Sequence, residues 1–189
     1  QTYKDAVDHG NEHWTLAGIL EQSSNVGMVI AGDKMTNEQR YNFISKFGIG
    51  QATGLNLPGE SEGVLHPSDS WDRRTRNTVL FGQGYTVNVM QLTNAVSVIA
   101  NKGVKKPQRI IKSITDTAGH VEEQQSKGEA TRVIDESVAS QMLNAMESSA
   151  EHYNTFVKVD GYRMAAKSGT AEVAGANGQL TSIISDRSE

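Results

Sequence analysis

The stretch from Gly161 to Val173 restricts the fold of this chain most, because side-chain character alternates along it before a small polar tip. Positions 162, 164 and 166 would face one side of an extended segment and positions 163, 165 and 167 the other, which is the period of a half-buried strand. The tip is Lys167-Ser168-Gly169-Thr170. A cation and two hydroxyls can donate to a carboxylate, and the glycine leaves room for a ligand backbone. The sequence therefore predicts a strand that binds the end of a peptide.

A second polar pattern lies far upstream, where Ser23 and Asn25 place a hydroxyl and a carboxamide two residues apart. They come directly before an apolar run at 26–30. Ser24, between them, is suited to cap a helix through this run. The cap would hold Ser23 and Asn25 at the start of the helix with their polar groups outward.

Composition narrows the class of protein. A chain of 189 residues is long enough for one domain with its own core. The net charge is −4 with both signs well mixed, so we expect no nucleic-acid partner. The absence of cysteine excludes disulfides and thiol chemistry and is compatible with an exported protein. No apolar run reaches the ~20 residues of a membrane span, so we expect any membrane anchor to lie outside this sequence.

Two patterns that suggest cofactors are incomplete. His9 and His13 are four residues apart, but Gly10 and Asn11 between them disfavour a helix that could aim both at a metal. The Gly-x-Gly run at 82–84 lacks the third glycine and the later acidic residue of a dinucleotide site. We predict a polar loop for the first, a turn for the second, and neither metal nor cofactor.

The remaining pattern indicates an α+β protein. A capping box at Thr36 predicts a helix that runs to Phe47, and Asn88 predicts a second capped helix. Strands are expected at 109–115 and 121–125, joined as a hairpin, and at 180–184. The second helix should bury a face formed by Val89, Leu92, Val96 and Ile99.

Ser-x-Asn followed later by Lys-Ser-Gly resembles two of the three signatures of penicillin-binding proteins and serine β-lactamases. Further runs at 53–60, 82–92 and 100–103 stand between them in the order found in class B penicillin-binding proteins, the peptidoglycan transpeptidases of septation and elongation. The resemblance implies an α+β fold of the penicillin-recognising serine transpeptidase and β-lactamase type, incomplete in this chain. An antiparallel sheet would pack on a helical subdomain, with the active site between them.

The resemblance also implies catalytic roles. Ser23 corresponds to the serine that relays a proton to the leaving amine, and Asn25 to the carboxamide that orients the acyl-donor peptide. Lys167 corresponds to the lysine that supports this relay electrostatically.

A substrate subsite is implied by the same likeness. Ser168 and Thr170 correspond to the hydroxyls that hold the terminal carboxylate of a D-alanyl-D-alanine stem peptide or of a β-lactam, on either side of Gly169. The main-chain amide of Thr170 corresponds to one of two oxyanion-hole donors.

The third family signature, Ser-x-x-Lys, is missing, because no serine is followed by a lysine three residues on. In the family this serine is the acylated nucleophile and precedes Ser-x-Asn. We therefore expect residues 1–189 to be part of a transpeptidase domain, without the N-terminal part that carries the nucleophile and without the C-terminal strand and helix. Such a chain should be inactive alone.

The function implied is a peptidoglycan D,D-transpeptidase that cross-links stem peptides through an acyl-serine and is inhibited by β-lactams. The parent protein would be membrane-anchored with this domain outside the cytoplasmic membrane, next to a glycosyltransferase and proteins of the divisome or elongasome. Two alternatives stay open. One is a serine β-lactamase or β-lactam sensor, and the other is a non-catalytic relative that binds peptidoglycan or partner proteins.

Overall fold

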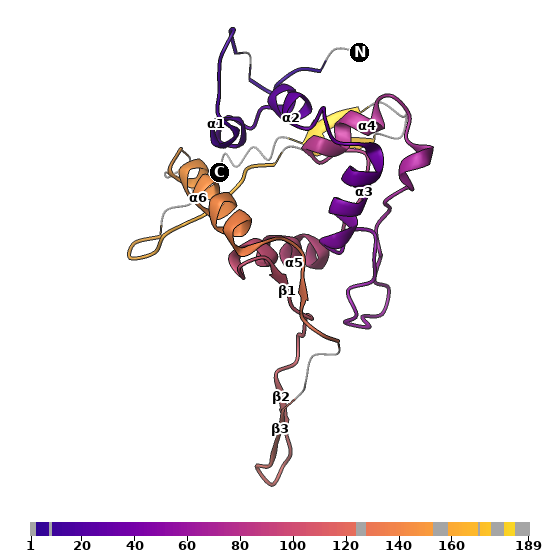
Figure 1. The fold of residues 1–189 in the computed structure, drawn as a ribbon. Helices are drawn as coiled ribbons and strands as arrows, with labels where there is room; N and C mark the ends of the chain where they lie inside the picture. The colour runs from indigo at the N-terminus through magenta and orange to yellow at the C-terminus, as the bar shows by residue number, and fades with distance from the viewer. Residues whose placement is uncertain are drawn as a thin grey trace.

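The structure, a computed structural model, describes residues 3–7, 9–123, 128–152, 159–169, 171–174 and 180–183, the last two ranges as backbone alone. Short helices fill the first half of the chain, and antiparallel strand pairs lie in the second half together with one longer helix, which fits the predicted α+β class (Figure 1). In chain order the elements are α1 (Leu16–Glu21), α2 (Asn25–Ala31), α3 (Asn37–Lys46), η1 (Ser68–Ser70), α4 (Thr75–Thr78), η2 (Val79–Phe81), α5 (Val89–Ala100), β1 (Val104–Lys105), β2 (Ser113–Thr115), β3 (Val121–Glu123), β4 (Thr131–Arg132), α6 (Glu136–His152), β5 (Ala171–Ala174) and β6 (Leu180–Ile183).

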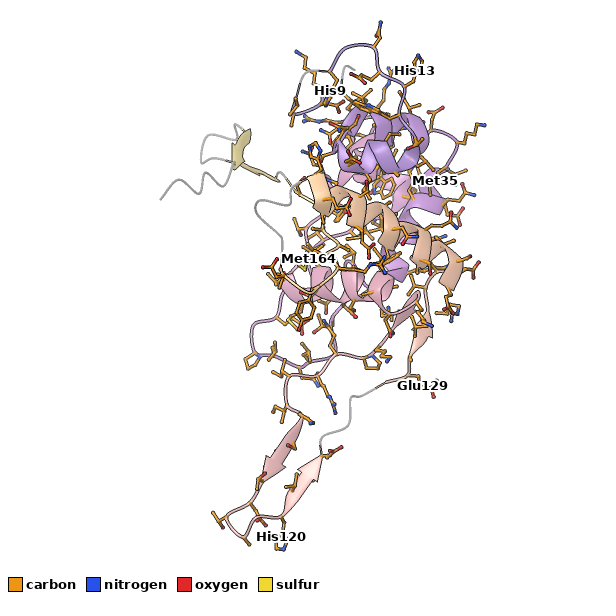
Figure 2. The ribbon with its side chains drawn as sticks, turned by 90° about the vertical axis from the view of Figure 1, so that its left-hand side faces the viewer. His9, His13, Met35, His120, Glu129 and Met164 are labelled. Carbon is orange, nitrogen blue, oxygen red and sulfur yellow. The ribbon has the colours of Figure 1, made fainter. Side chains whose placement is uncertain are left out.

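The helices are arranged in a ring, and a β-hairpin projects from this ring as an arm (Figure 1). Strands pair antiparallel as β1 with β4, β2 with β3, and β5 with β6. The arm is β2–β3, with Asp116 accepting from the amides of Ala118 and His120 in its turn. His120 lies at its tip, far from His9 and His13 at the other end of the molecule (Figure 2). This confirms the hairpin predicted from 109–125, although the strands are shorter.

The helix starts follow the predicted capping residues. Ser24 Oγ accepts from the amide of Gly27 at 2.8 Å and begins α2. Thr36 and Asn88 each form a complete capping box, at the starts of α3 and α5. Gly48 follows α3 with φ of 93°, a conformation that glycine adopts without steric cost. Capping depends on residues two or three apart, so these predictions needed no knowledge of the tertiary structure.

Within this chain, the predicted buried face of α5 is mostly exposed, so the prediction is wrong here. Val89 is 78% exposed, Leu92 55% and Val96 47%. The buried positions are Gln91 and Val98 instead. Gln91 Nε2 donates to two carbonyls, those of Gln51 and Glu62, each at 2.7 Å, and so turns the opposite face of α5 toward the 51–63 loop.

The predicted strand at 161–167 is also wrong. Residues 163–169 have no regular secondary structure, and β5 begins only at Ala171. The amide of Ala166 donates to the carbonyl of Met146 in α6 at 3.1 Å, so this segment runs against a helix. The returning strand predicted at 180–184 is confirmed as β6, which pairs with β5.

Helix α6 packs against both α1 and α5. Its buried positions are mostly small, namely Ala139, Met146, Ser149 and Ala150, and small side chains let helices approach closely. Ser148 Oγ donates to Glu21 Oε2 at 2.9 Å across the contact with α1. Among the helices that the structure describes, none is both long and apolar enough for a membrane crossing.

A buried arginine joins three segments. Arg40 in α3 is only 2% exposed. Its guanidinium donates to the carbonyl of Gly32 at 2.8 Å, to the carbonyl of Arg76, and to Asn77 Oδ1 at 3.4 Å. The planar fork of five donors suits several carbonyl acceptors at once. Arg40 thereby ties α3 to the end of α2 and to α4.

We expect Arg40→Leu to lower the free energy of unfolding by about 1–3 kcal/mol, because its acceptors lose a charged donor in a buried site. Urea unfolding would measure the change. The exposed Arg73 provides the control, since Arg73→Leu should change stability by no more than about 0.5 kcal/mol. Equal or greater stability for Arg40→Leu would mean that desolvation of the guanidinium outweighs its hydrogen bonds.

Candidate functional site

The two polar patterns of the sequence meet in space. Lys167 Nζ donates to Ser23 Oγ at 2.6 Å, although the residues are 144 positions apart. A short N–H···O distance is typical of a hydrogen bond from a charged donor. We call the group formed by Ser23, Asn25 and Lys167 the Ser-Lys corner.

Ser23 lies in the turn between α1 and α2 with φ of 55°. This left-handed conformation is uncommon for a residue with a side chain, and such conformations concentrate at functional sites. The next residue, Ser24, is 2% exposed and caps α2. The buried hydroxyl of Ser24 anchors the turn, so the hydroxyl of Ser23 is left on the outer side to meet Lys167.

Asn25 is the first residue of α2, and its Nδ2 donates to the carbonyl of Lys4 at 3.2 Å. The neighbouring Asp5 contacts the same turn. Asp5 Oδ2 accepts from Ser24 Oγ at 2.8 Å, and Oδ1 accepts from the amide of Val26 at 3.0 Å. Sequence reasoning missed Lys4 and Asp5, because a contact across about twenty residues leaves no spacing pattern.

Lys167 is positioned by α6. The amide of Ala166 donates to the carbonyl of Met146 at 3.1 Å, and Arg163 Nη2 lies 2.5 Å from Glu147 Oε2. Since α6 packs on α1, and α1 leads directly into Ser23, one helix contact brings both halves of the Ser-Lys corner together.

The ammonium of Lys167 has three oxygen acceptors nearby. Besides Ser23 Oγ, these are the carbonyl of Ser168 at 2.8 Å and Ser168 Oγ at 3.3 Å. A lysine has three donors, so these acceptors can saturate it. No carboxylate is among these acceptors, and burial lowers the pKa of Lys167 below its ordinary value. The ammonium of Lys167 is therefore held by neutral oxygens, and none of these three acceptors carries a negative charge.

Ser168 and Gly169 are exposed beside Lys167, and a Cβ on Gly169 would meet no atom within 4 Å. Thr170, the other predicted substrate-binding residue, lies outside the described residues. The structure thus places Ser23, Asn25, Lys167, Ser168 and Gly169 at one location.

A surface pocket elsewhere is not this corner. It lies beside α3, α5 and β1, and its lining includes Gln51, Gln91 and Gln108.

In the described ranges no three His, Cys, Asp or Glu side chains are grouped to hold a metal ion. His9 packs edge-on against the ring of Trp14, with centroids 4.8 Å apart.

The structure joins a Ser-x-Asn turn to a Lys-Ser-Gly segment on an α+β scaffold. This combination defines the class of penicillin-recognising proteins. Residues 1–185 match the family described as penicillin binding protein transpeptidase domain, and the chain belongs to this family.

The chain is also similar in sequence to named penicillin-binding proteins and transpeptidases. The chain is 36% identical over 179 residues to penicillin-binding protein PbpB of Mycobacterium tuberculosis, covering 90% of the chain and 26% of that protein. It is 34% identical over 167 residues to the peptidoglycan D,D-transpeptidase FtsI of Escherichia coli K12, covering 87% of the chain and 26% of that protein. The chain thus spans only about a quarter of the length of these relatives.

The fold of the chain is also similar to solved structures of related proteins. A peptidoglycan synthetase from Bifidobacterium adolescentis is 99% identical, with a TM-score of 0.88 over 95% of this chain and 33% of that one. Penicillin-binding protein 3 of Mycobacterium tuberculosis in complex with ampicillin is 32% identical, with a TM-score of 0.85 over 95% of this chain and 41% of that one. These neighbours confirm the predicted fold class.

We expect an NMR titration of the Lys167 side chain to give a pKa below that of a lysine in an unstructured peptide, ~10.4. Because the unfolded chain holds this proton more tightly, the free energy of unfolding should rise with pH between the two values. Ser23→Ala should lower the pKa of Lys167 further, since it removes an acceptor that stabilises the cation.

Ser61→Ala provides the control, because Ser61 Oγ accepts from the amide of Gly63 in a different loop. The pKa of Lys167 should not change in this variant. A pKa of Lys167 at or above the peptide value would contradict the partial desolvation of its ammonium in the corner.

Proposed function

We propose that this chain forms part of the transpeptidase domain of a peptidoglycan D,D-transpeptidase that forms an acyl-serine intermediate and is acylated by β-lactams. The observation that carries the proposal is the hydrogen bond from Lys167 to Ser23, which unites the two family signatures present in the sequence. Membership of the transpeptidase family supports it.

In this proposal the nucleophile is the serine of a Ser-x-x-Lys segment outside this chain. Its hydroxyl oxygen attacks the penultimate D-alanyl carbonyl of a stem peptide and gives up its proton. The bond to the terminal D-alanine breaks as the amine of that D-alanine takes up this proton. Ser23 relays this proton, and the charge of Lys167 favours transfer through the hydroxyl. The carboxamide of Asn25 hydrogen-bonds the acyl-donor backbone and holds it in register.

The terminal carboxylate of the stem peptide or of a β-lactam would bind next to Lys167. The cation attracts the carboxylate, and the hydroxyls of Ser168 and Thr170 donate to it. The open space around Gly169 supports this assignment, because a ligand backbone can lie there without displacing the chain. Carboxylate affinity should therefore fall as pH rises through the lowered pKa of Lys167.

The exposed face of α5 supports a larger domain. Val89, Leu92 and Val96 recur at positions i, i+3 and i+7, the spacing of a helix face that packs against a neighbour. Water-exposed apolar surface of this kind costs free energy that burial would recover. We propose that further chain of the same domain, including the segment with the nucleophile, covers this face.

The proposed activity also implies where the parent protein would act and which proteins it would work with. Stem peptides are cross-linked outside the cytoplasmic membrane, so the domain would act there, tethered by an anchor elsewhere in the parent. A glycosyltransferase that makes the glycan strands, with divisome or elongasome proteins, would be its working partners.

We expect Ser23→Ala and Lys167→Ala in the parent protein to slow acylation by a fluorescent penicillin about 10²-fold or more, as for removal of a proton-transfer group. Ser168→Ala should act mainly on affinity, about 10-fold, because it removes one hydrogen bond to the carboxylate. Time-resolved labelling on denaturing gels would measure the rates.

The matched control is Lys102→Ala, which removes an exposed lysine whose ammonium lies 3.0 Å from Glu136. Its acylation rate should equal that of the parent. Unchanged rates in both Ser23→Ala and Lys167→Ala would contradict the proposed mechanism. Rapid turnover of a chromogenic cephalosporin by the parent would instead indicate a β-lactamase.

The isolated chain 1–189 should form no penicillin adduct that survives denaturation, because no Ser-x-x-Lys is present. It should also bind the apolar dye ANS through the exposed α5 face. Leu92→Glu should weaken dye binding, whereas Glu122→Gln on the exposed arm should leave it unchanged. A stable covalent adduct of the isolated chain would contradict the assignment of the nucleophile to another segment.

A further inference from the structure

We propose that Asp5 is a positioning residue for the Ser-Lys corner, holding Ser23 and Asn25 in place through Ser24 and the first turn of α2. The inference rests on the proposed function, because it assigns Asp5 a role in acylation through residues that would touch the substrate.

The carboxylate of Asp5 binds the residue that follows each polar group of the Ser-x-Asn signature. Its Oδ2 accepts from Ser24 Oγ, which directly follows Ser23, at 2.8 Å. Its Oδ1 accepts from the amide of Val26, which directly follows Asn25, at 3.0 Å. One short side chain thus holds Ser24 and Val26, which directly follow Ser23 and Asn25.

The contact goes beyond ordinary helix capping. Ser24 already satisfies the amide of Gly27 as the cap of α2. Its hydroxyl still has a proton to donate, and at 2% exposure that donor is cut off from water. Asp5 accepts this proton, which fixes the hydroxyl rotor of Ser24 and keeps its lone pairs directed at α2. A carboxylate is suited to the task because it only accepts hydrogen bonds.

The residues before Asp5 are anchored as well. The carbonyl of Lys4 accepts from Asn25 Nδ2 at 3.2 Å, so the same short segment orients the Asn25 carboxamide. Tyr3 accepts at its hydroxyl from Asn77 Nδ2 at 3.1 Å and packs edge-on against Phe81, with centroids 6.2 Å apart. We call residues 3–5 the strap. It connects the Ser-Lys corner to the α4–η2 region.

The strap explains how the unusual backbone of Ser23 is maintained. A non-glycine residue with φ of 55° persists only where its surroundings hold it. Loss of the Asp5 contacts would free the turn to relax toward a commoner conformation. Ser23 Oγ would then move from Lys167 Nζ, and displacement of a catalytic group by about 1 Å can cost 10²-fold in rate.

The test compares Asp5→Ala and Asp5→Asn in the parent protein. Asp5→Ala should slow acylation by fluorescent penicillin on the order of 10- to 100-fold, measured well below the melting temperature. Asp5→Asn should recover part of the rate, because its amide oxygen can still accept from Val26. Equal rates for Asp5→Ala and the unchanged protein overturn the inference.

The matched control is Asp116→Ala. Asp116 Oδ1 accepts from the amides of Ala118 and His120 at 2.8 and 2.9 Å, so it also holds a local turn, but in the β2–β3 arm that projects from the helices (Figure 1). This variant should lose thermal stability without slowing acylation. If both variants slow acylation in proportion to their loss of folded protein, Asp5 has no positioning role.

A double-variant cycle separates positioning from a general loss of structure. If Asp5 acts through Asn25 and Ser23, Asp5→Ala should slow acylation much less in an Asn25→Ala background than in the unchanged protein. Fully multiplicative effects overturn the inference. Failure of the proposed function is distinct from both outcomes, because the unchanged parent would then form no penicillin adduct at all.

Discussion

The hydrogen bond between Lys167 and Ser23 is the contact on which the proposed site of this chain depends. It closes a loop of well over a hundred residues, and closing a loop of that length costs several kcal/mol of chain entropy. That cost is met elsewhere, mainly where α6 packs on α1. The corner itself contains few contacts, so its geometry is inherited from the helices that carry it.

Polar anchors hold much of this architecture. Arg40, Gln91 and Ser24 are each 2% exposed, and each donates to carbonyl or carboxylate oxygens of distant segments. Hydrogen bonds are directional, unlike apolar contacts, so such anchors fix orientation as well as proximity. This suits a site in which a serine hydroxyl and a carboxamide must be aimed at the same ligand.

The helix-cap predictions, which depend on contacts between residues close in sequence, were correct, and the predictions for the α5 face and the 161–167 segment, which depend on contacts between distant residues, were wrong. The caps at Thr36 and Asn88 were predictable because their partners lie three residues away. The face of α5 was not, because periodicity gives a helix its two faces without saying which neighbour is present. The 161–167 segment alternates like a strand, yet it hydrogen-bonds to Met146 within α6, and no local rule could anticipate that partner.

The sequence alone determined the chemical inventory: the Ser-x-Asn and Lys-Ser-Gly groups, their order, the capped helices and the family to which they point. The tertiary structure decided that Lys167 reaches Ser23, that Gln91 rather than Leu92 faces inward, and that Asp5 braces the turn. The division has a physical reason. Side-chain chemistry and short-range hydrogen bonding are encoded within a few residues, whereas proximity across the chain emerges only when helices pack.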